Sequence, residues 1–531
     1  MIHILPSKTS FIGNAKAGRI SPVYAELPFI SPQTIFEAIQ SPNSFLLESI
    51  KGPEKIARYS FIGAEPFLVF RVKNGIVEVK NSSEFVGAGF KPAQTGDAKG
   101  FRNLSPLKKL KELITGYKIE SHPDLPPFIG GAVGMLSYDF VHYFENIPRT
   151  AVDDLNIPDA HFMLIDTVIA VDHKLQKTFI ISCPLHGKQV QKCKSAKARK
   201  RGSADVGAGF KPALAEWEDV YDKACEKINA IYGKINAILS VGADLKPAST
   251  NMHIHIHHEM GQEKYMNIVK KAKEYIKAGD IFQANLSQRV SAHIGSINPW
   301  QIYQTLSKIN PSPFAAYLDM GDYHIASSSP ERLVRVTGNI VETRPIAGTR
   351  PRGKNAEADS QMRADLLLNE KERAEHLMLI DLERNDLGRI SDYSSVEVDE
   401  HMITEDYSHV IHIVSNVKGI LASGMDCFDA IRATFPGGTI TGVPKVRCME
   451  IIDELEPVTR GPYTGSIGYI SFTGDMDLNI IIRTFVIKDN VAYVQAGAGI
   501  VADSDPEREY YETLKKAEAL IRTLESLQVY L

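Results

Sequence analysis

The stretch Glu372-Arg-Ala-Glu-His-Leu-Met-Leu-Ile-Asp-Leu-Glu-Arg-Asn-Asp386 organises the chain. Glu372 and Glu375 are three residues apart, so on a helix their carboxylates share one face. The run from Leu377 to Leu382 is apolar almost throughout, which predicts a helix buried on most sides. Carboxylates at the edge of a buried helix are costly unless a cation holds them. The spacing alone leaves two interpretations open, a cation site or two solvated glutamates.

A second pair of glutamates with the same spacing, Glu509 and Glu512, lies near the end of the chain. Asp505 and Pro506 predict the N-cap and first turn of a helix, and Glu509, Glu512 and Lys516 then line one face of it. The apolar stripe predicted for this helix is Tyr510, Leu514, Ala517, Ile521 and Leu524. Four carboxylates from two helices would form an oxygen-rich site suited to Mg2+. An exposed i,i+4 pair between Glu512 and Lys516 explains the spacing equally well.

Length and composition indicate a large globular protein. The chain has 531 residues, 44% of them hydrophobic and 23% charged, and a net charge of −4. This charge gives no electrostatic case for a nucleic-acid partner. The five cysteines lack CxxC spacing, so neither a disulfide framework nor a zinc site is indicated. We see no targeting signal at the N-terminus and no apolar run long enough for a bilayer, and therefore expect a cytoplasmic protein without a membrane partner.

Residues 1–185 alternate short β-rich runs with turns, and we take them as an N-terminal region. The Asn74-Gly75 pair between two such runs predicts a β-hairpin, and residues 105–115 predict a helix. Strands joined by hairpins, with helices packed on them, indicate the α+β class with mostly antiparallel sheets.

Residues 186–258 are predicted to be a linker and insert region. The motif Val-Gly-Ala-Gly-Phe-Lys-Pro-Ala occurs at 86–93 and again at 206–213, and loosely at 241–248. The uneven spacing excludes a solenoid and indicates insertions in exposed loops. The basic stretch 188–201 is interpreted as a solvated insert rather than a nucleic-acid patch. Residues 253–258 place His at alternate positions, as a strand would, and we do not expect a functional metal site there.

Residues 259–527 are predicted to be the catalytic domain, and six motifs in them are distinctive. They are Gly279-Asp-Ile-Phe-Gln-Ala-Asn-Leu-Ser-Gln288, Ser329-Pro-Glu331, Thr343-Arg-Pro-Ile-Ala-Gly-Thr349, the stretch 372–386, Gly437-Gly-Thr-Ile-Thr-Gly-Val-Pro-Lys445 and Gln495-Ala-Gly-Ala-Gly-Ile500. Together they resemble the chorismate-utilising enzymes, which include anthranilate synthase component I, aminodeoxychorismate synthase component I, and the isochorismate and salicylate synthases. Leu46-Leu-Glu-Ser49, Arg58-Tyr-Ser-Phe-Ile-Gly63 and Gly130-Gly-Ala-Val-Gly134 extend the resemblance to residues 1–185, as in the two amino-transferring members. The resemblance implies an anthranilate-synthase-like fold, with antiparallel sheets in a sandwich flanked by helices.

The resemblance also implies how chorismate and Mg2+ are bound. Glu375 and Glu512 are expected to bind Mg2+, with Glu372 and Glu509 beside them, and the metal to hold the ring carboxylate. Lys516 is expected to contact a substrate carboxylate.

Arg483 lies among large apolar residues in 480–485, which predicts a strand, and a buried Arg needs an anion. In the family this Arg binds the enolpyruvyl carboxylate. Tyr463 and the backbone N–H groups of Gly497, Ala498 and Gly499 complete the expected substrate contacts, because glycine lets the backbone approach a ligand closely. Without the resemblance, Gly-Ala-Gly indicates only a turn.

The expected catalytic residues follow from the same resemblance. Glu331 is expected to protonate the departing C4 hydroxyl of chorismate. His412 corresponds to the active-site His of the family, although a lone His among apolar residues is usually a core residue. Gln283 occupies the position of the Lys that activates water in the isochorismate-forming members, so it argues for ammonia as the nucleophile. Thr349 is the last catalytic candidate, and it lies in the same motif as Ala347.

Ammonia must come from another chain. Here no Cys lies in a nucleophile elbow, and Cys427 lies in Met-Asp-Cys-Phe. We therefore expect a separate glutamine amidotransferase subunit as partner.

Six short sequence motifs resemble those of aminodeoxychorismate synthase more than those of anthranilate synthase. They are Asn310-Pro-Ser-Pro-Phe-Ala-Ala-Tyr317, Asp381-Leu-Glu-Arg-Asn-Asp386, Gly438-Thr-Ile-Thr-Gly442, Gly465-Ser-Ile-Gly-Tyr-Ile-Ser471, Asp475-Met-Asp-Leu-Asn479 and Ala502-Asp-Ser-Asp-Pro506. Ala347 points the other way, because well-known aminodeoxychorismate synthases have a nucleophilic Lys in this motif and anthranilate synthases have Ala. We favour aminodeoxychorismate synthase and keep anthranilate synthase as the alternative.

Two further expectations concern regulation and activity. Ser49 is a regulatory candidate, because Leu46-Leu-Glu-Ser49 resembles the tryptophan-binding stretch of anthranilate synthases. On its own this stretch indicates a core strand. A non-catalytic scaffold subunit is the remote alternative, and it would predict losses among the acids, Arg483 and the glycine-rich motif, none of which is lost.

Overall fold

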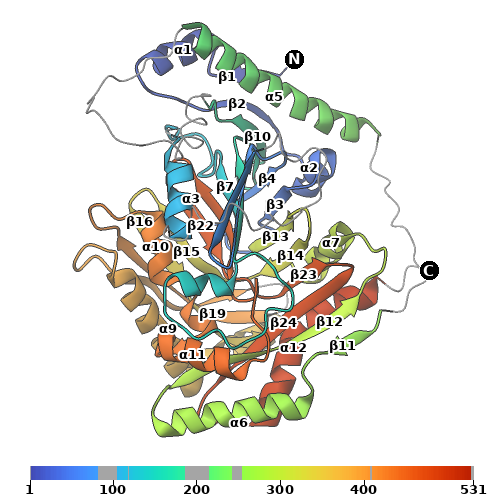
Figure 1. The fold of residues 1–531 in the computed structure, drawn as a ribbon, viewed down its shortest axis with the longest axis vertical. Coiled ribbons are helices and arrows are strands. Elements are labelled where there is room, and N and C mark those ends of the chain that lie inside the picture. Colours follow the sequence, from blue (N-terminus) through green and yellow to red (C-terminus); the bar gives the residue numbers. More distant parts are fainter. Residues whose placement is uncertain are drawn as a thin grey trace.

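The computed structural model describes residues 2–81, 105–117, 119–185, 214–241, 254–406 and 410–527. The repeated motif at 86–93 and 206–213, residues 242–248 of its loose copy, the basic stretch 188–201 and His253 lie outside the described residues. Two sheets and their flanking helices make up the described part of the chain (Figure 1).

The first sheet has 13 strands among the described residues, and every neighbouring pair is antiparallel. Their order is β1 (Ile4–Leu5), β2 (Val23–Pro28), β10 (Lys177–Ser182), β9 (Thr167–Asp172), β4 (Tyr59–Gly63), β3 (Ser44–Glu48), β13 (Phe314–Asp319), β14 (His324–Ser329), β23 (Thr484–Lys488), β24 (Val491–Ile500), β12 (Gln283–His293) and β11 (Ile256–His258), with β20 (Gly442–Val443) also paired to β12.

The second sheet has 11 strands in the same described ranges and is also antiparallel. Their order is β17 (Ile346–Pro351), β19 (Val410–Ile420), β16 (Ile340–Arg344), β15 (Arg332–Thr337), β22 (Met476–Asn479), β21 (Ser466–Ser471), β7 (Gly131–Leu136), β8 (Ala160–Ile165), β5 (Leu68–Lys73) and β6 (Ile76–Asn81), with β18 (Glu397–Asp406) paired to β19. Each sheet joins strands from both halves of the sequence, through β3 with β13 and β7 with β21.

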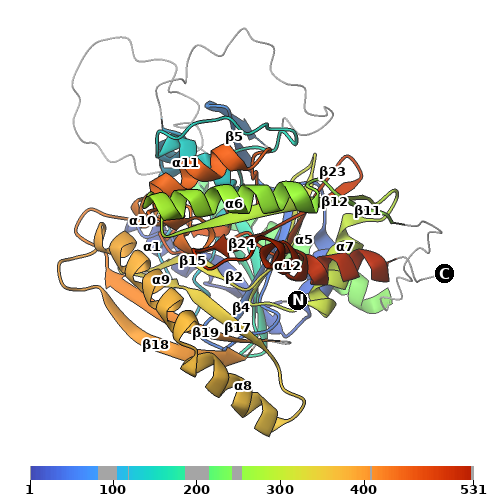
Figure 2. The same cartoon turned by 90° about the horizontal axis from the view of Figure 1, so that it is seen from below.

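Helices surround the two sheets (Figures 1 and 2). The α-helices are α1 (Lys8–Lys16), α2 (Pro32–Ile39), α3 (Pro106–Thr115), α5 (Leu214–Val241), α6 (Gln262–Ala278), α7 (Pro299–Ile309), α8 (Ala356–Leu368), α9 (Glu370–Gly388), α10 (Cys427–Thr434), α11 (Lys445–Leu455) and α12 (Pro506–Ser526), and the short 3-10 helices are η3 (Tyr138–Tyr143) and η4 (Gly438–Ile440). Helix α5 lies within the range predicted as linker and packs on β2, β10 and α2; the predicted domain boundaries stay a prediction. Among the described residues, no helix combines the length and the apolar character that a membrane span needs.

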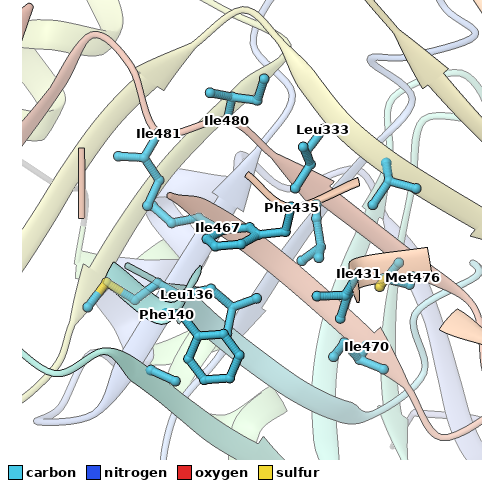
Figure 3. Packing of buried hydrophobic residues seen from close by; sticks show 14 of the residues in the cluster. Leu136, Phe140, Leu333, Ile431, Phe435, Ile467, Ile470, Met476, Ile480 and Ile481 are labelled. Atoms are coloured by element: carbon cyan, nitrogen blue, oxygen red, sulfur yellow. The ribbon is translucent and has the colours of Figure 1, made fainter. Parts of the chain in front are cut away.

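Burial alternates along the strands of the first sheet because successive side chains point to opposite faces. Phe45, Phe61 and Ala170 belong to a core shared with the second sheet, whereas their neighbours Leu46 and Ile62 pack in a core with α2, α5 and α7. Figure 3 shows another part of this larger core, with side chains labelled from strands of the second sheet and from η3 and α10. The first sheet is therefore covered on both faces, as a middle layer between the second sheet and the helices.

Local predictions agree with the structure wherever the signal is local. Asn74 and Gly75 have φ of 50° and 76° in the turn between β5 and β6, which is the geometry of a type I′ hairpin. Asp505 caps α12 by accepting a hydrogen bond from the N–H of Arg508. The buried stripe of α12 differs from the prediction: Thr513 and Leu520 are buried, while Leu514 and Ile521 are only partly buried.

Candidate active site

Two connections cross from one sheet to the other at the same point. Glu331 lies between β14 of the first sheet and β15 of the second, and Arg483 lies between β22 of the second and β23 of the first. The N–H of Ile480 donates to the carbonyl of Glu331 at 3.0 Å, and the N–H of Ser328 donates to the carbonyl of Arg483 at 3.1 Å. The prediction that Arg483 lies inside a strand is wrong, because the chain changes sheets there, with a φ of 52° at Arg483.

Glu331 is a buried carboxyl with an altered acidity. It is 6% exposed. Burial raises its pKa to about 7, while the hydroxyl of Thr439, the charge of Arg483, the N–H of Ile346 and the charge of Lys516 act in the opposite direction. At neutral pH a large fraction of Glu331 therefore holds a proton, and cations for an anionic ligand lie nearby.

His412 and Thr349 face each other across β17 and β19. The Oγ1 of Thr349 lies 3.0 Å from Nδ1 of His412, and the carbonyl of Gly348 lies 3.2 Å from the same nitrogen. Burial and the charge of Arg483 lower the pKa of His412 to about 4, so the ring is neutral at neutral pH. Ala347, on the same strand, is buried and offers no nucleophile.

The glycine-rich strand β24 packs tightly against residues that line the site. A Cβ at Gly497 would lie 2.5 Å from Oδ1 of Asn285 and 2.8 Å from the hydroxyl of Tyr463, and one at Gly499 would overlap the amide of Gln283. The sequence therefore needs glycine here so that β12 and Tyr463 can approach the backbone. Ala498 lies between them, opposite Leu286 of β12.

Lys516 joins α12 to this strand, because its Nζ donates to the carbonyl of Gly497 at 3.0 Å. It also forms a 2.9 Å ion pair with Glu512, and the two side chains are 45% and 51% exposed. A pair this exposed contributes about 0.3–0.5 kcal/mol. Lys516 can therefore exchange Glu512 for a ligand carboxylate at little cost.

The first carboxylate pair lies at the start of α9, where Asn369 accepts a hydrogen bond from the N–H of Glu372 and caps the helix. Arg350 of β17 donates to Glu372 at 3.0 Å, and Nε2 of Gln283 donates to Glu375 at 3.3 Å. Burial raises the pKa of Glu375, and the charges of Glu372 and Glu512 raise it further. Helices α9 and α12 thus bring carboxylates from both ends of the domain within electrostatic reach.

A cation site remains a prediction. Burial and the charge of Glu512 raise the pKa of Glu509, while Ser504 lowers it. Among the described residues, no three His, Cys, Asp or Glu side chains are gathered closely enough to bind a metal ion. Carboxylate oxygens from two helices fit the preference of Mg2+, and the repulsion that raises the pKa of Glu375 is what a cation between these groups would relieve.

The structure places the remaining candidates as follows. Ser49 directly follows β3. Its Oγ donates to the carbonyl of Pro313 and its N–H to Oγ of Ser60, so these hydrogen bonds go to no candidate catalytic residue. Sequence reasoning missed Arg350, Asn369 and Asn285. Only Asn369 had a local signal, an Asn three residues before Glu372 at a helix start, because the other two depend on contacts between distant strands and helices.

Comparison with known proteins identifies the family. Residues 45–522 match the family model described as chorismate binding enzyme. The chain belongs to the chorismate-binding enzymes. It is 43% identical over 509 residues to anthranilate synthase component 1 of Acetivibrio thermocellus, covering 95% of this chain and 94% of that protein. It is 42% identical over 480 residues to aminodeoxychorismate synthase component 1 of Bacillus subtilis (strain 168), covering 90% and 91%.

A solved structure of the same family has the same fold. Anthranilate synthase component I from Streptococcus pneumoniae TIGR4 is 34% identical to this chorismate-binding enzyme, with a TM-score of 0.70, covering 92% of this chain and 97% of that one. The predicted α+β, anthranilate-synthase-like fold is therefore confirmed. Relatives with two different products match at nearly equal identity, so similarity alone does not choose between them.

Proposed function

We propose that this chorismate-binding enzyme aminates chorismate to 4-amino-4-deoxychorismate, for 4-aminobenzoate and folate synthesis, with ammonia from a separate glutamine amidotransferase subunit. The main support is Glu331, a buried acid whose pKa is raised to about 7 and which lies near the cations Arg483 and Lys516. Such an acid can protonate the hydroxyl that ammonia replaces. Chorismate has two carboxylates and a C4 hydroxyl that must leave as water, and this set of groups matches those needs.

The proposed roles are those that the family resemblance implies, and the geometry of the site is compatible with them. Glu331 gives its proton to the C4 oxygen as the C4–O bond breaks and ammonia forms the C4–N bond. Water departs, the nitrogen becomes an ammonium group, and Glu331 becomes a carboxylate next to Arg483. Arg483 and Tyr463, with the backbone of Gly497 to Gly499, hold the enolpyruvyl carboxylate, and Lys516 holds the ring carboxylate. His412 stays neutral, with Nδ1 at the carbonyl of Gly348. Mg2+, held by Glu375 and Glu512 with Glu372 and Glu509 beside them, would supply positive charge for the ring carboxylate.

Ammonia rather than water is the proposed nucleophile. Gln283 donates its amide N–H to Glu375, and an amide has no basic group that could activate water. Both relatives named above are called component 1, which supports a partner chain that delivers ammonia.

The six short motifs that resemble aminodeoxychorismate synthase support entry of ammonia at C4. A second candidate is anthranilate synthase, in which ammonia enters at C2 and pyruvate leaves, and Ala347 favours it. Ala347 is 8% exposed and pairs with Ile413 on β19, so the strand offers no lysine for attack on C2.

The product formed from chorismate decides between the two candidates. With chorismate, ammonium and Mg2+, the purified chain is expected to accumulate an aminated chorismate that retains its pyruvyl group. Mass spectrometry detects it, and an added lyase should convert it to 4-aminobenzoate. Fluorescent anthranilate with equimolar pyruvate would instead establish the second candidate.

The nitrogen source tests the partner. We expect ammonium salts to support turnover by the isolated chain and glutamine to support none, because no glutaminase site is expected in it. Adding a glutamine amidotransferase subunit should restore glutamine-dependent turnover. Glutamine-dependent product from the purified chain alone would refute the partner proposal.

A further inference from the structure

Helix α9 carries a second pair of acids, Glu383 and Asp386, two to three turns beyond the first pair. They are 4% and 1% exposed, far more buried than Glu372 and Glu375. The proposed chemistry uses neither of them. A buried carboxylate costs several kcal/mol unless it is paired or protonated, so each of these acids needs a physical explanation.

Asp386 has a cation of its own. Nζ of Lys445 lies 2.5 Å from its Oδ2 and also donates to the carbonyl of Thr434 at 3.2 Å. Lys445 is the first residue of α11 and follows the turn 437–444. The ion pair between Asp386 and Lys445 therefore connects α9 to the start of α11.

Glu383 has no ion-pair partner among the residues that the structure describes, and its Oε2 has no hydrogen-bond partner there. The hydroxyl of Thr343 lowers the pKa of its carboxyl. Burial and the neighbouring charge of Asp386 raise the pKa of Glu383 to about 8, against the opposing charge of Lys445. At neutral pH Glu383 is therefore mostly a neutral carboxylic acid.

Two segments beside Glu383 also lie beside Glu331. Thr343 lies on β16, and the chain reaches Ile346, whose N–H faces Glu331, three residues later. On the other side, a Cβ at Gly438 would lie 3.7 Å from Oε1 of Glu383 and would overlap Leu382. The hydroxyl of the next residue, Thr439, lowers the pKa of Glu331.

We propose that Glu383 is a positioning residue for the acid Glu331. Its buried carboxyl packs beside β16 and the 437–441 turn, and so keeps the segments that carry Ile346 and Thr439 in place around the Glu331 carboxyl. This role rests on the proposed function only in requiring Glu331 as the acid, which both amination products share. Because Glu383 acts as a neutral group, an amide of the same shape should replace it.

Three variants test this role. Glu383→Ala is expected to lower kcat about 10- to 100-fold, the effect of a small misplacement of reacting groups, with KM for chorismate changed less than about threefold. Glu383→Gln is expected to keep kcat within about threefold of wild type. Leu387→Ala is the matched control, since it truncates a fully buried residue one turn further along α9; it should lower Tm and leave kcat unchanged.

The outcomes separate this role from general stability and from the identity of the product. Normal kcat in Glu383→Ala, an equal loss in Glu383→Gln, or an equal loss in Leu387→Ala would each overturn it. The product released by the wild-type chain is measured in the same reactions and tests the proposed function alone. Infrared spectroscopy tests the role without turnover. The C=O band of protonated Glu331 is assigned by its loss in Glu331→Gln. This band should shift in Glu383→Ala and keep its wild-type frequency in Glu383→Gln.

Discussion

Replacing Glu331 with Gln is expected to lower kcat for chorismate consumption by roughly 10²- to 10⁴-fold, the range for loss of a general acid. Gln keeps the shape of the side chain but cannot give a proton to the leaving hydroxyl. Binding of chorismate should weaken little, because Arg483 and Lys516 remain. Turnover and chorismate binding are measured separately, by product formation and by calorimetry. An active Glu331→Gln variant would remove Glu331 from the mechanism.

The pH dependence of the wild-type chain provides a second test of Glu331. Its pKa is raised to about 7 by burial, and the acid must be protonated to act. We therefore expect kcat/KM to fall as pH rises above about 7, and this alkaline limb to be absent from the residual activity of Glu331→Gln.

The same shift predicts an effect on stability that separates folding from catalysis. The folded-state pKa lies above the ordinary value of 4.5, so the folded state binds the extra proton between about pH 4.5 and 7. As pH rises from about 4.5 to 7, the free energy of unfolding of the wild type should therefore decrease relative to that of Glu331→Gln. Above about pH 7 the difference between the two proteins should stay constant. Chemical denaturation of both proteins at several pH values measures the difference. A constant difference across the window would contradict a raised pKa.

Replacing Glu375 or Glu512 with Gln is expected to abolish chorismate turnover while leaving the fold intact. Each change removes one of the carboxylate ligands proposed for Mg2+, and the amide oxygen left behind has no charge with which to hold the ion. In Glu375→Gln the folded state also loses a buried carboxyl whose pKa is raised, so Tm should not fall. Turnover against Mg2+ concentration, Mg2+ binding by calorimetry and circular dichroism measure the three effects.

A glutamate elsewhere on α12 serves as the control for Glu512. Glu518 forms ion pairs with Lys515 and Arg522, away from the candidate site, so Glu518→Gln should retain wild-type turnover and Mg2+ binding. Full activity in Glu375→Gln or Glu512→Gln would refute the proposed cation site. Loss of activity with unchanged Mg2+ binding would refute the metal role and leave these residues to be explained by substrate contacts.

The sequence by itself determined the local structure and the chemical inventory of the protein. The hairpin at Asn74-Gly75 and the Asp505-Pro506 start of α12 were predicted correctly, because each depends on groups within a few residues of one another. The motifs also predicted the family, which the comparisons confirm. These signals lie in residues close together in the sequence, so they can be recognised without knowing any tertiary contact.

The tertiary structure alone decided which acids and cations lie together. Glu331 and Arg483 meet because two connections cross between the sheets side by side, and their backbone hydrogen bonds join residues far apart in the chain. Glu383 lies in the same motif as the candidate metal ligands, yet the fold places it beside Gly438 and within electrostatic reach of Glu331. Burial then sets the protonation of both acids, because the cost of a charge depends on the groups that exclude water around it. That environment is assembled from distant segments, which the order of residues along one segment does not specify.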